Sequence, residues 1–141
     1  MSAAAARRWT CPACDREFSR ANQSHVCVPG CTVDESFAGR APVQRAIYEA
    51  LIEHVRSLGP VHVDAVRIGV FLKNHTKFAE FRPKARCLSL ELVLPRRVNE
   101  PRVFRQAEIS EGRVVHTIKL TSITDVDPQL RAWLTEAYEA G

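Results

Sequence analysis

The sequence predicts an α+β protein in which a small cysteine-rich knuckle precedes a domain of two helices and an antiparallel sheet. Three observations support this fold class: a cluster of cysteines near the N-terminus, apolar residues at helical spacing over 42–58 and near the C-terminal end, and alternating apolar residues in between. Strands joined by short turns pair antiparallel, and two amphipathic helices can cover one face of such a sheet. The expected order is knuckle, helix, sheet of four to six strands, and C-terminal helix.

The composition is that of a globular protein with one ordinary domain and a small appendage. The chain has 141 residues, of which 45% are hydrophobic and 26% charged. No apolar run approaches the roughly 20 residues that a membrane-spanning helix needs. The alanine-rich start lacks the apolar core of a signal peptide. We therefore expect a cytoplasmic protein without a membrane partner, divided into a disordered lead (1–8), a metal-binding module (9–31), a connector (32–41) and an α+β domain (42–141).

Four of the five cysteines lie between Cys11 and Cys31, and His25 stands among them. Thiolates paired at two-residue spacing, as in Cys11 and Cys14, followed by further sulfur or imidazole donors, form the ligand set that tetrahedral zinc selects. The second pair of ligands comes from His25, Cys27 and Cys31, and the spacing alone does not decide among them. The competing interpretation is a set of free thiols or a redox pair.

A zinc ion in this module is expected to be structural. Four protein ligands leave no open coordination position for water or substrate. The module also has too few apolar residues to fold alone, so the metal would supply most of its folding free energy.

The clearest predicted helix runs from Pro42 to Leu58. Proline suits the first helical turn, and Gly59-Pro60 is a strong stop signal. The apolar stripe of this helix consists of Val43, Ile47, Leu51, Val55 and Leu58.

Alternating patterns predict strands over 61–63, 66–72, 77–82, 86–94, 102–109 and 113–121. The strongest is 86–94, where four leucines share one face. Asp127-Pro128 then predicts the start of the C-terminal helix. Its inner face is expected to carry Leu130, Trp133, Leu134, Ala137 and Tyr138.

The positive charge of the chain is concentrated in its middle. The net charge is +4, and residues 61–121 carry twelve basic and six acidic side chains. If the helices cover the aliphatic face of the sheet, the opposite face carries cations with Phe71 among them, as in surfaces that stack and clamp single strands. The alternative is an edge aromatic shielded by long basic stems on a solvated surface. The candidate anion- or nucleic-acid-binding residues are Arg67, Phe71, Lys73, Arg96, Arg97, His116 and Lys119.

No catalytic motif is recognisable in the sequence. A phosphate-binding glycine loop, a nucleophile elbow and a close pair of carboxylates with a histidine are all missing. We therefore expect a non-enzymatic zinc-binding module that binds nucleic acid or another anionic partner through a basic sheet face. The alternatives are a protein-interaction or regulatory module that uses the knuckle, and a small-molecule or enzymatic pocket near His116.

The motifs resemble a bacterial family known as domain of unknown function 5655. The resemblance rests on the segment 9–14, on Arg16, Phe18, Asn22-Gln23 and His25-Val26-Cys27, and on later stretches at 37, 59–61, 92–97 and 132–138. It covers about the whole chain from Trp9 onward. It implies Cys11, Cys14, His25 and Cys27 as the metal ligands, with Cys31 outside the pattern, and it implies no activity.

Overall fold

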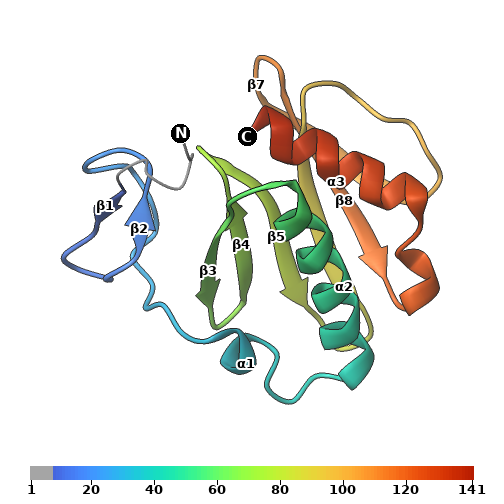
Figure 1. The fold of residues 1–141 in the computed structure, drawn as a ribbon, viewed down its shortest axis with the longest axis horizontal. Helices are drawn as coiled ribbons and strands as arrows, with labels where there is room; N and C mark the ends of the chain where they lie inside the picture. The colour runs from blue at the N-terminus through green and yellow to red at the C-terminus, as the bar shows by residue number, and fades with distance from the viewer. Residues whose placement is uncertain (1–7) are drawn as a thin grey trace.

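The computed structural model describes residues 8–141 and contains the predicted α+β arrangement. Residues 1–7, nearly the whole of the predicted lead, lie outside the described part. Figure 1 shows the short N-terminal hairpin standing beside a sheet that carries the helices. The elements, in chain order, are β1 (Trp9–Thr10), β2 (Glu17–Phe18), α1 (Val33–Ser36), α2 (Pro42–Leu58), β3 (His62–Val66), β4 (Gly69–Lys73), β5 (Lys77–Pro83), β6 (Leu88–Leu94), β7 (Val103–Ser110), β8 (Arg113–Leu120), η2 (Ile123–Asp125) and α3 (Pro128–Ala140).

Six strands form one antiparallel sheet in the order β3-β4-β5-β6-β8-β7, and α2 and α3 cover one of its faces (Figure 1). Alternation explains which face is covered, because successive side chains of a strand point to opposite sides. The four leucines of β6, at 88, 90, 92 and 94, are each at most 1% exposed and form the centre of the core. The prediction of an antiparallel sheet of up to six strands is confirmed.

Both long helices begin where their sequences predicted. Helix α2 has Pro42 in its first turn and buries Ile47, Leu51 and Val55 completely. The Asp127 carboxylate caps α3 by accepting a hydrogen bond of 2.9 Å from the amide of Leu130. None of the helices in the described residues is long and apolar enough to cross a membrane.

The prediction of one strand over 66–72 is wrong. The chain reverses at Arg67 and Ile68, so that β3 and β4 form a hairpin in which Val66 pairs with Gly69. Val66 and Val70 therefore lie on opposite faces of the sheet. The turn escaped detection because it contains none of the glycine or asparagine that usually mark hairpins, and because the apolar alternation happens to continue through it.

The two edges of the sheet differ. Along β3, Gly30 forms an isolated bridge with Val66, and the amide of Cys31 donates a hydrogen bond of 2.9 Å to the carbonyl of Ala65. At the other edge, β7 is paired only with β8, and its Phe104 and Ile109 are 50% and 53% exposed.

The connector between the knuckle and α2 is packed against the main domain. Helix α1 begins with a capping box, in which Thr32 and Glu35 exchange hydrogen bonds. Ser36 donates a bond of 2.6 Å to the carbonyl of Val66. Phe37 is buried against Tyr48, with 5.3 Å between the ring centroids. The knuckle is thus followed by a fixed segment of chain.

Candidate metal centre

Cys11, Cys14, His25 and Cys27 come together at the N-terminal hairpin, with one ligand atom of each within 4.8 Å of the others. The group can therefore hold a metal ion. It combines three thiols with one imidazole, and these are the same four residues that the family resemblance implies as ligands. Two of the four, Cys11 and Cys14, are buried.

The backbone around Asp15 explains why the first two sulfurs lie together. The amide of Cys11 donates a hydrogen bond of 2.9 Å to the carbonyl of Arg16, and the amide of Asp15 donates one of 2.7 Å to the carbonyl of Cys11. Asp15 has a φ of 62°, a left-handed conformation that aspartate tolerates better than most residues. This tight turn between β1 and β2 places both thiols on the inside of the knuckle.

His25 is oriented by its neighbours. Its Nδ1 lies 2.6 Å from the carbonyl oxygen of Gln23, which can only accept, so Nδ1 carries the proton. The free lone pair of Nε2 then faces the sulfurs of Cys14 and Cys27, at 3.4 and 3.3 Å. The ring also stacks on Phe18, with 3.9 Å between centroids. A backbone carbonyl that fixes the tautomer in this way is a common support for a metal-ligating histidine.

The thiols differ in acidity. A hydrogen bond from the backbone amide of Cys14 is the main influence that lowers the pKa of Cys11 to about 6. The hydrogen bond with the Cys11 sulfur is the main influence that raises the pKa of Cys27 to about 11. The lowered pKa favours the thiolate of Cys11 at neutral pH, and the thiolate is the form that binds metals.

Cys31, the alternative ligand, lies outside this group. Its sulfur contacts the carbonyl of Thr32 at 3.4 Å and the hydroxyl of Ser36 at 3.6 Å, at the start of α1. It packs against the core of the main domain, so the chain has already left the knuckle at this point.

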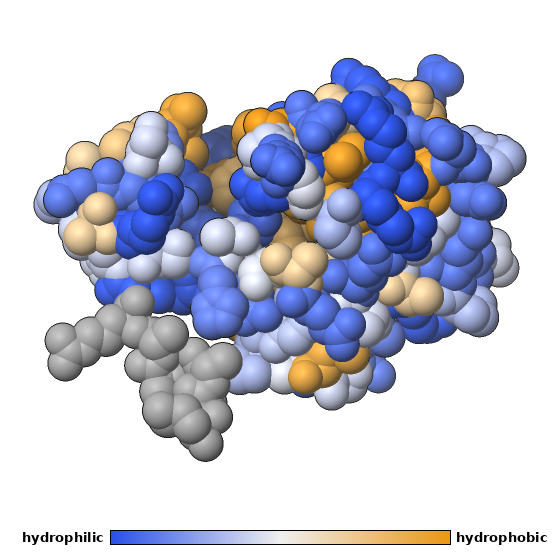
Figure 2. Space-filling model, turned by 90° about the horizontal axis from the view of Figure 1, so that it is seen from above, coloured by the Kyte–Doolittle hydropathy of each residue, from blue (hydrophilic) through white to orange (hydrophobic). Residues whose placement is uncertain are grey.

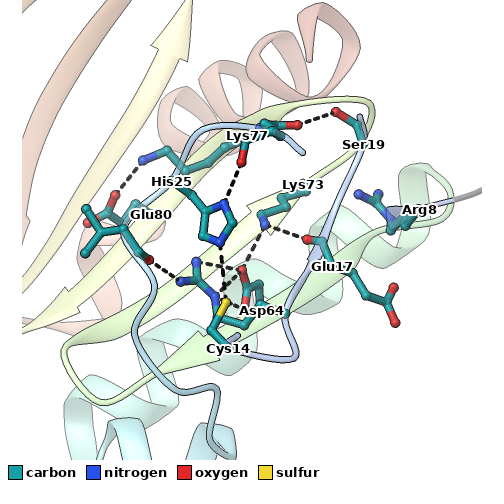
Figure 3. A network of polar contacts seen from close by, with 12 residues as sticks. Arg8, Cys14, Glu17, Ser19, His25, Asp64, Lys73, Lys77 and Glu80 are labelled. Atoms are coloured by element: carbon teal, nitrogen blue, oxygen red, sulfur yellow. Dashed lines mark hydrogen bonds and ion pairs between the residues drawn. The ribbon is translucent and has the colours of Figure 1, made fainter. Parts of the chain in front are cut away.

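A buried ion-pair network joins the knuckle to the sheet (Figure 3). Asp64 of β3 accepts hydrogen bonds from Arg16, next to the cysteine turn, and from Lys73 of β4, at 3.0 and 2.8 Å from its Oδ2. Lys73 also donates a bond of 3.0 Å to the carbonyl of Glu17 in β2. The three charged side chains are at most 8% exposed. We call these residues, Arg16, Asp64 and Lys73, the docking triad.

The protonation states of the docking triad follow from its geometry. Burial by itself raises the pKa of Asp64, but the hydrogen bonds from Arg16 and Lys73 outweigh it and hold the pKa below its ordinary value. For Lys73 burial dominates and lowers the pKa, although Asp64 opposes the shift. The carboxylate stays ionised because two cations bind it.

Aromatic rings support the same interface. The Lys73 ammonium lies 4.1 Å from the centroid of the Phe18 ring, and the Arg16 guanidinium lies 5.2 Å from it. Phe71 of β4 has the guanidinium of Arg16 at 5.4 Å and the ammonium of Lys77 at 5.1 Å. These are distances at which a cation is attracted to a ring face.

The predicted basic sheet face is divided by this interface. Arg67 lies in the β3–β4 turn and not on a sheet face, and Lys73 is buried in the docking triad instead of facing solvent. Phe71 is half-buried beside the knuckle. Lys119 is exposed on β8 with its ammonium 4.4 Å from the ring of Phe104. The structure therefore brings Phe71 and Lys73 together but leaves Arg67 and Lys119 apart from them.

The remaining candidates are engaged with other groups. Arg96 pairs with Glu136 of α3 at 2.9 Å, and Arg97 with Glu108 of β7 at 3.7 Å. His116 is 1% exposed. Its Nδ1 donates to the carbonyl of Val114 and its Nε2 accepts from the amide of Val98, both at 3.0 Å. Both ring nitrogens are thus bonded to the backbone, and the alternative of a pocket around His116 loses its support.

Sequence reasoning missed the residues that attach the knuckle. Arg16 and Asp64 are 48 positions apart, and no local pattern pairs them. Arg16 belongs to the segment that carries the family resemblance, and Asp64 is an acidic residue within a short strand, but neither signal indicates that the two side chains meet.

Most of the chain matches a known protein family. Residues 33–141 match the family described as Domain of unknown function (DUF5655). The match covers more than half of the sequence, and the chain therefore belongs to this family. The cluster of Cys11, Cys14, His25 and Cys27 precedes the matched segment. Searches of curated proteins and of solved structures gave no match.

Proposed function

We propose that the four-residue cluster binds one structural Zn²⁺. The observation that carries this proposal is the convergence of three sulfurs and one imidazole nitrogen within 4.8 Å. Tetrahedral zinc with Zn–S bonds of about 2.3 Å holds its sulfurs about 3.8 Å apart. The sulfurs of Cys11 and Cys27 are 3.8 Å apart, so this donor set fits zinc. Zinc there would act as a cross-link, because four protein ligands leave no position for a substrate.

The knuckle supports a stabilising role for the ion. Its own apolar cluster consists only of Cys11, Cys14 and Phe18, with Trp9 packed against them. So small a cluster cannot offset the entropy lost on ordering the segment. Metal binding would therefore hold β1 and β2 together and present Arg16 and Phe18 to the sheet.

We further propose that the protein is a non-enzymatic module that binds an anionic partner, with nucleic acid as the partner class. Support comes from the excess of basic side chains in residues 61–121 and from the exposed positions of several of them, including Arg67, Arg105 and Lys119. Exposed basic side chains attract phosphates and make binding sensitive to salt. None of the described residues forms a recognisable catalytic group.

The metal content of purified protein tests the zinc proposal. Mass spectrometry should find one zinc per chain in the wild type and in Cys31→Ser, and none in His25→Ala. Zinc that is lost with Cys31 and kept without His25 would contradict the ligand assignment. A wild type without metal would restore the interpretation of the thiols as redox groups.

Retention of single-stranded and double-stranded nucleic acid at rising salt tests the partner class. Binding that weakens steeply with salt is expected. A protein that shows no retention at low salt would contradict a nucleic-acid partner.

A second candidate is a protein-interaction module that uses the knuckle. Val26, between the ligands His25 and Cys27, is 77% exposed, and Ile68 in the neighbouring turn is 58% exposed. Apolar side chains exposed close together mark contact surfaces. Polar substitution of Val26 would weaken such a contact without changing the metal content.

A further inference from the structure

A cavity of about 380 Å³ lies between the knuckle and the outer face of β4 and β5. Cavities from roughly 300 Å³ upward accommodate small ligands. In Figure 2 a recess separates the N-terminal module on the left from the rest of the molecule, with hydrophobic residues on both sides of it. The lining includes Phe18, His25 and Val26 from the knuckle, and Phe71, Lys77 and Arg82 from the sheet.

Phe71 provides an aromatic surface in this cavity. It stands on the sheet face that the helices leave uncovered, directly opposite Glu80 of β5. The ring is half-buried, so part of it remains accessible from the cavity. The ammonium of Lys77 lies 5.1 Å from its centroid. A flat ligand resting against Phe71 would therefore have a cation beside it.

Arg82 and Lys77 retain unused hydrogen-bond donors. Lys77 donates one bond of 2.8 Å to Oε1 of Glu80, and Arg82 uses only its Nε, toward Oε2 of the same carboxylate. Among the described residues, the terminal guanidinium nitrogens of Arg82 have no hydrogen-bond partner. A guanidinium with free terminal nitrogens is a suitable group for holding a phosphate through two hydrogen bonds.

The charge balance of the cavity is positive. None of the residues that line it is acidic, whereas Arg16, Lys73, Lys77 and Arg82 all contribute to the lining. Two buried carboxylates pair with these cations: Asp64 with Arg16 and Lys73, and Glu80 with Lys77 and Arg82. Two positive charges remain in excess, and a terminal phosphate carries a charge of about −1.5 to −2 at neutral pH.

We propose that this cavity binds one nucleotide, with its base against Phe71 and its phosphate at Arg82 and Lys77. Val26 and Ile68, both exposed at the rim, would contact the base or sugar. This inference rests on the proposed nucleic-acid binding and locates that binding in the cavity between the knuckle and the sheet. The same chemistry is offered by a free mononucleotide and by the terminal nucleotide of a single strand.

Fluorescence anisotropy distinguishes these sources. The probe is a 5′-phosphorylated oligothymidylate of about twelve nucleotides, long enough for typical single-strand sites, labelled at its 3′ end; adenosine monophosphate is the competitor. Phe71→Leu removes the ring and keeps apolar volume, and Arg82→Gln removes the free donors. Each should weaken binding about tenfold, because Phe71→Leu removes the stacking surface and Arg82→Gln removes the donors for the phosphate. The matched control is Arg86→Gln, which removes an exposed arginine outside the cavity and should change binding about twofold or less.

Circular dichroism establishes that each variant is folded. Should Arg82→Gln fail to fold, Arg82→Lys keeps a charge for Glu80 while losing the fork, and it should still weaken binding. Competition by the mononucleotide supports a free nucleotide as ligand. Weakening of oligomer binding by Phe71→Leu and Arg82→Gln without such competition supports a strand terminus. If Phe71→Leu and Arg82→Gln bind the oligomer as tightly as Arg86→Gln does, the cavity proposal is overturned. Nucleic-acid binding elsewhere on the protein would then still stand. The absence of oligomer binding at low salt overturns both.

Discussion

Asp64 is the residue on which the attachment of the knuckle depends most. It is 5% exposed and is bound by two cations, Arg16 from the knuckle and Lys73 from the neighbouring strand. Removing one partner of a buried ion pair leaves an uncompensated charge, which destabilises far more than the loss of an exposed pair. The Asp64 carboxylate is therefore required to compensate the buried positive charges of Arg16 and Lys73.

We predict that Asp64→Asn lowers the free energy of unfolding by about 3–5 kcal/mol. Asparagine keeps the size of the side chain but leaves two buried cations without a counter-charge. The matched control is Asp34→Asn, which removes an 84% exposed partner of Arg45 and should cost about 1 kcal/mol or less. Denaturant titration measures both. Equal losses in the two variants would contradict the role of the docking triad.

A second prediction concerns His116 and pH. Burial lowers the pKa of His116 below its ordinary value, despite the hydrogen bond that the ring donates to the carbonyl of Val114, which opposes the shift. The unfolded chain therefore binds the proton more readily, and the stability from the neutral ring is lost as the pH falls below about 6.5. Burial also lowers the pKa of His62, which adds to the same trend.

Thermal unfolding between pH 7 and pH 5 measures this effect. The wild type should lose stability over that range, His116→Gln should lose less, and a variant with both His116→Gln and His62→Gln should lose least. A wild-type curve that is flat over this range would contradict the prediction.

At the scale of elements, close approach of the backbone explains Gly69. A Cβ on this residue would collide with the carbonyl oxygen of Phe81 in the adjacent strand. Gly112, in the turn between β7 and β8, has a φ of 72° but open space around it. The first glycine is required by packing and the second by backbone conformation alone.

We predict that Gly69→Ala destabilises the protein by about 2–3 kcal/mol, because β4 and β5 must separate. Gly112→Ala should cost about 1 kcal/mol, since only left-handed strain is added. Equilibrium unfolding in denaturant compares the two. A smaller loss for Gly69→Ala than for Gly112→Ala would contradict this assignment.

The elements that can be predicted from the sequence are those whose apolar residues repeat with the period of a helix or of a strand throughout. The leucines of β6 and the stripe of α2 do so, and both elements were predicted nearly to their ends. The hairpin at Arg67 and Ile68 was missed because its turn has no special residue. The capping box of Thr32 and Glu35 was a detectable signal for α1 that went unused.

The candidate site was partly predictable for a related reason. The candidate ligands Cys11 and Cys14 were predictable from their spacing, because two intervening residues place both thiols on one turn. The docking triad joins residues far apart in the chain, and no local pattern encodes such a pairing. The cavity beside Phe71 likewise exists only because the knuckle folds back onto the sheet.

At the scale of the whole molecule, the two units differ in how they are stabilised. The main domain has a large core under α2 and α3, whereas the knuckle has a few buried side chains and the proposed ion. Loss of the ion is therefore expected to release the knuckle while the sheet and helices stay folded.

We predict that a strong zinc chelator exposes Arg16, which is buried in the docking triad, to trypsin and leaves the far-ultraviolet circular dichroism of the helices unchanged. The Cys31→Ser variant should respond like the wild type, because Cys31 lies outside the cluster. Mass spectrometry of the fragments locates the cleavage. Cooperative unfolding of the whole chain on chelation would contradict this independence.

The unequal edges of the sheet limit how copies of this chain can join. The strand backbone of β7 can accept a further strand, while residues 30–31 already occupy part of the edge at β3. Addition of a strand is thus less hindered at β7 than at β3. Two chains that meet through their β7 strands would use up the open edge of each chain, so such a pair leaves no β7 edge for a further copy.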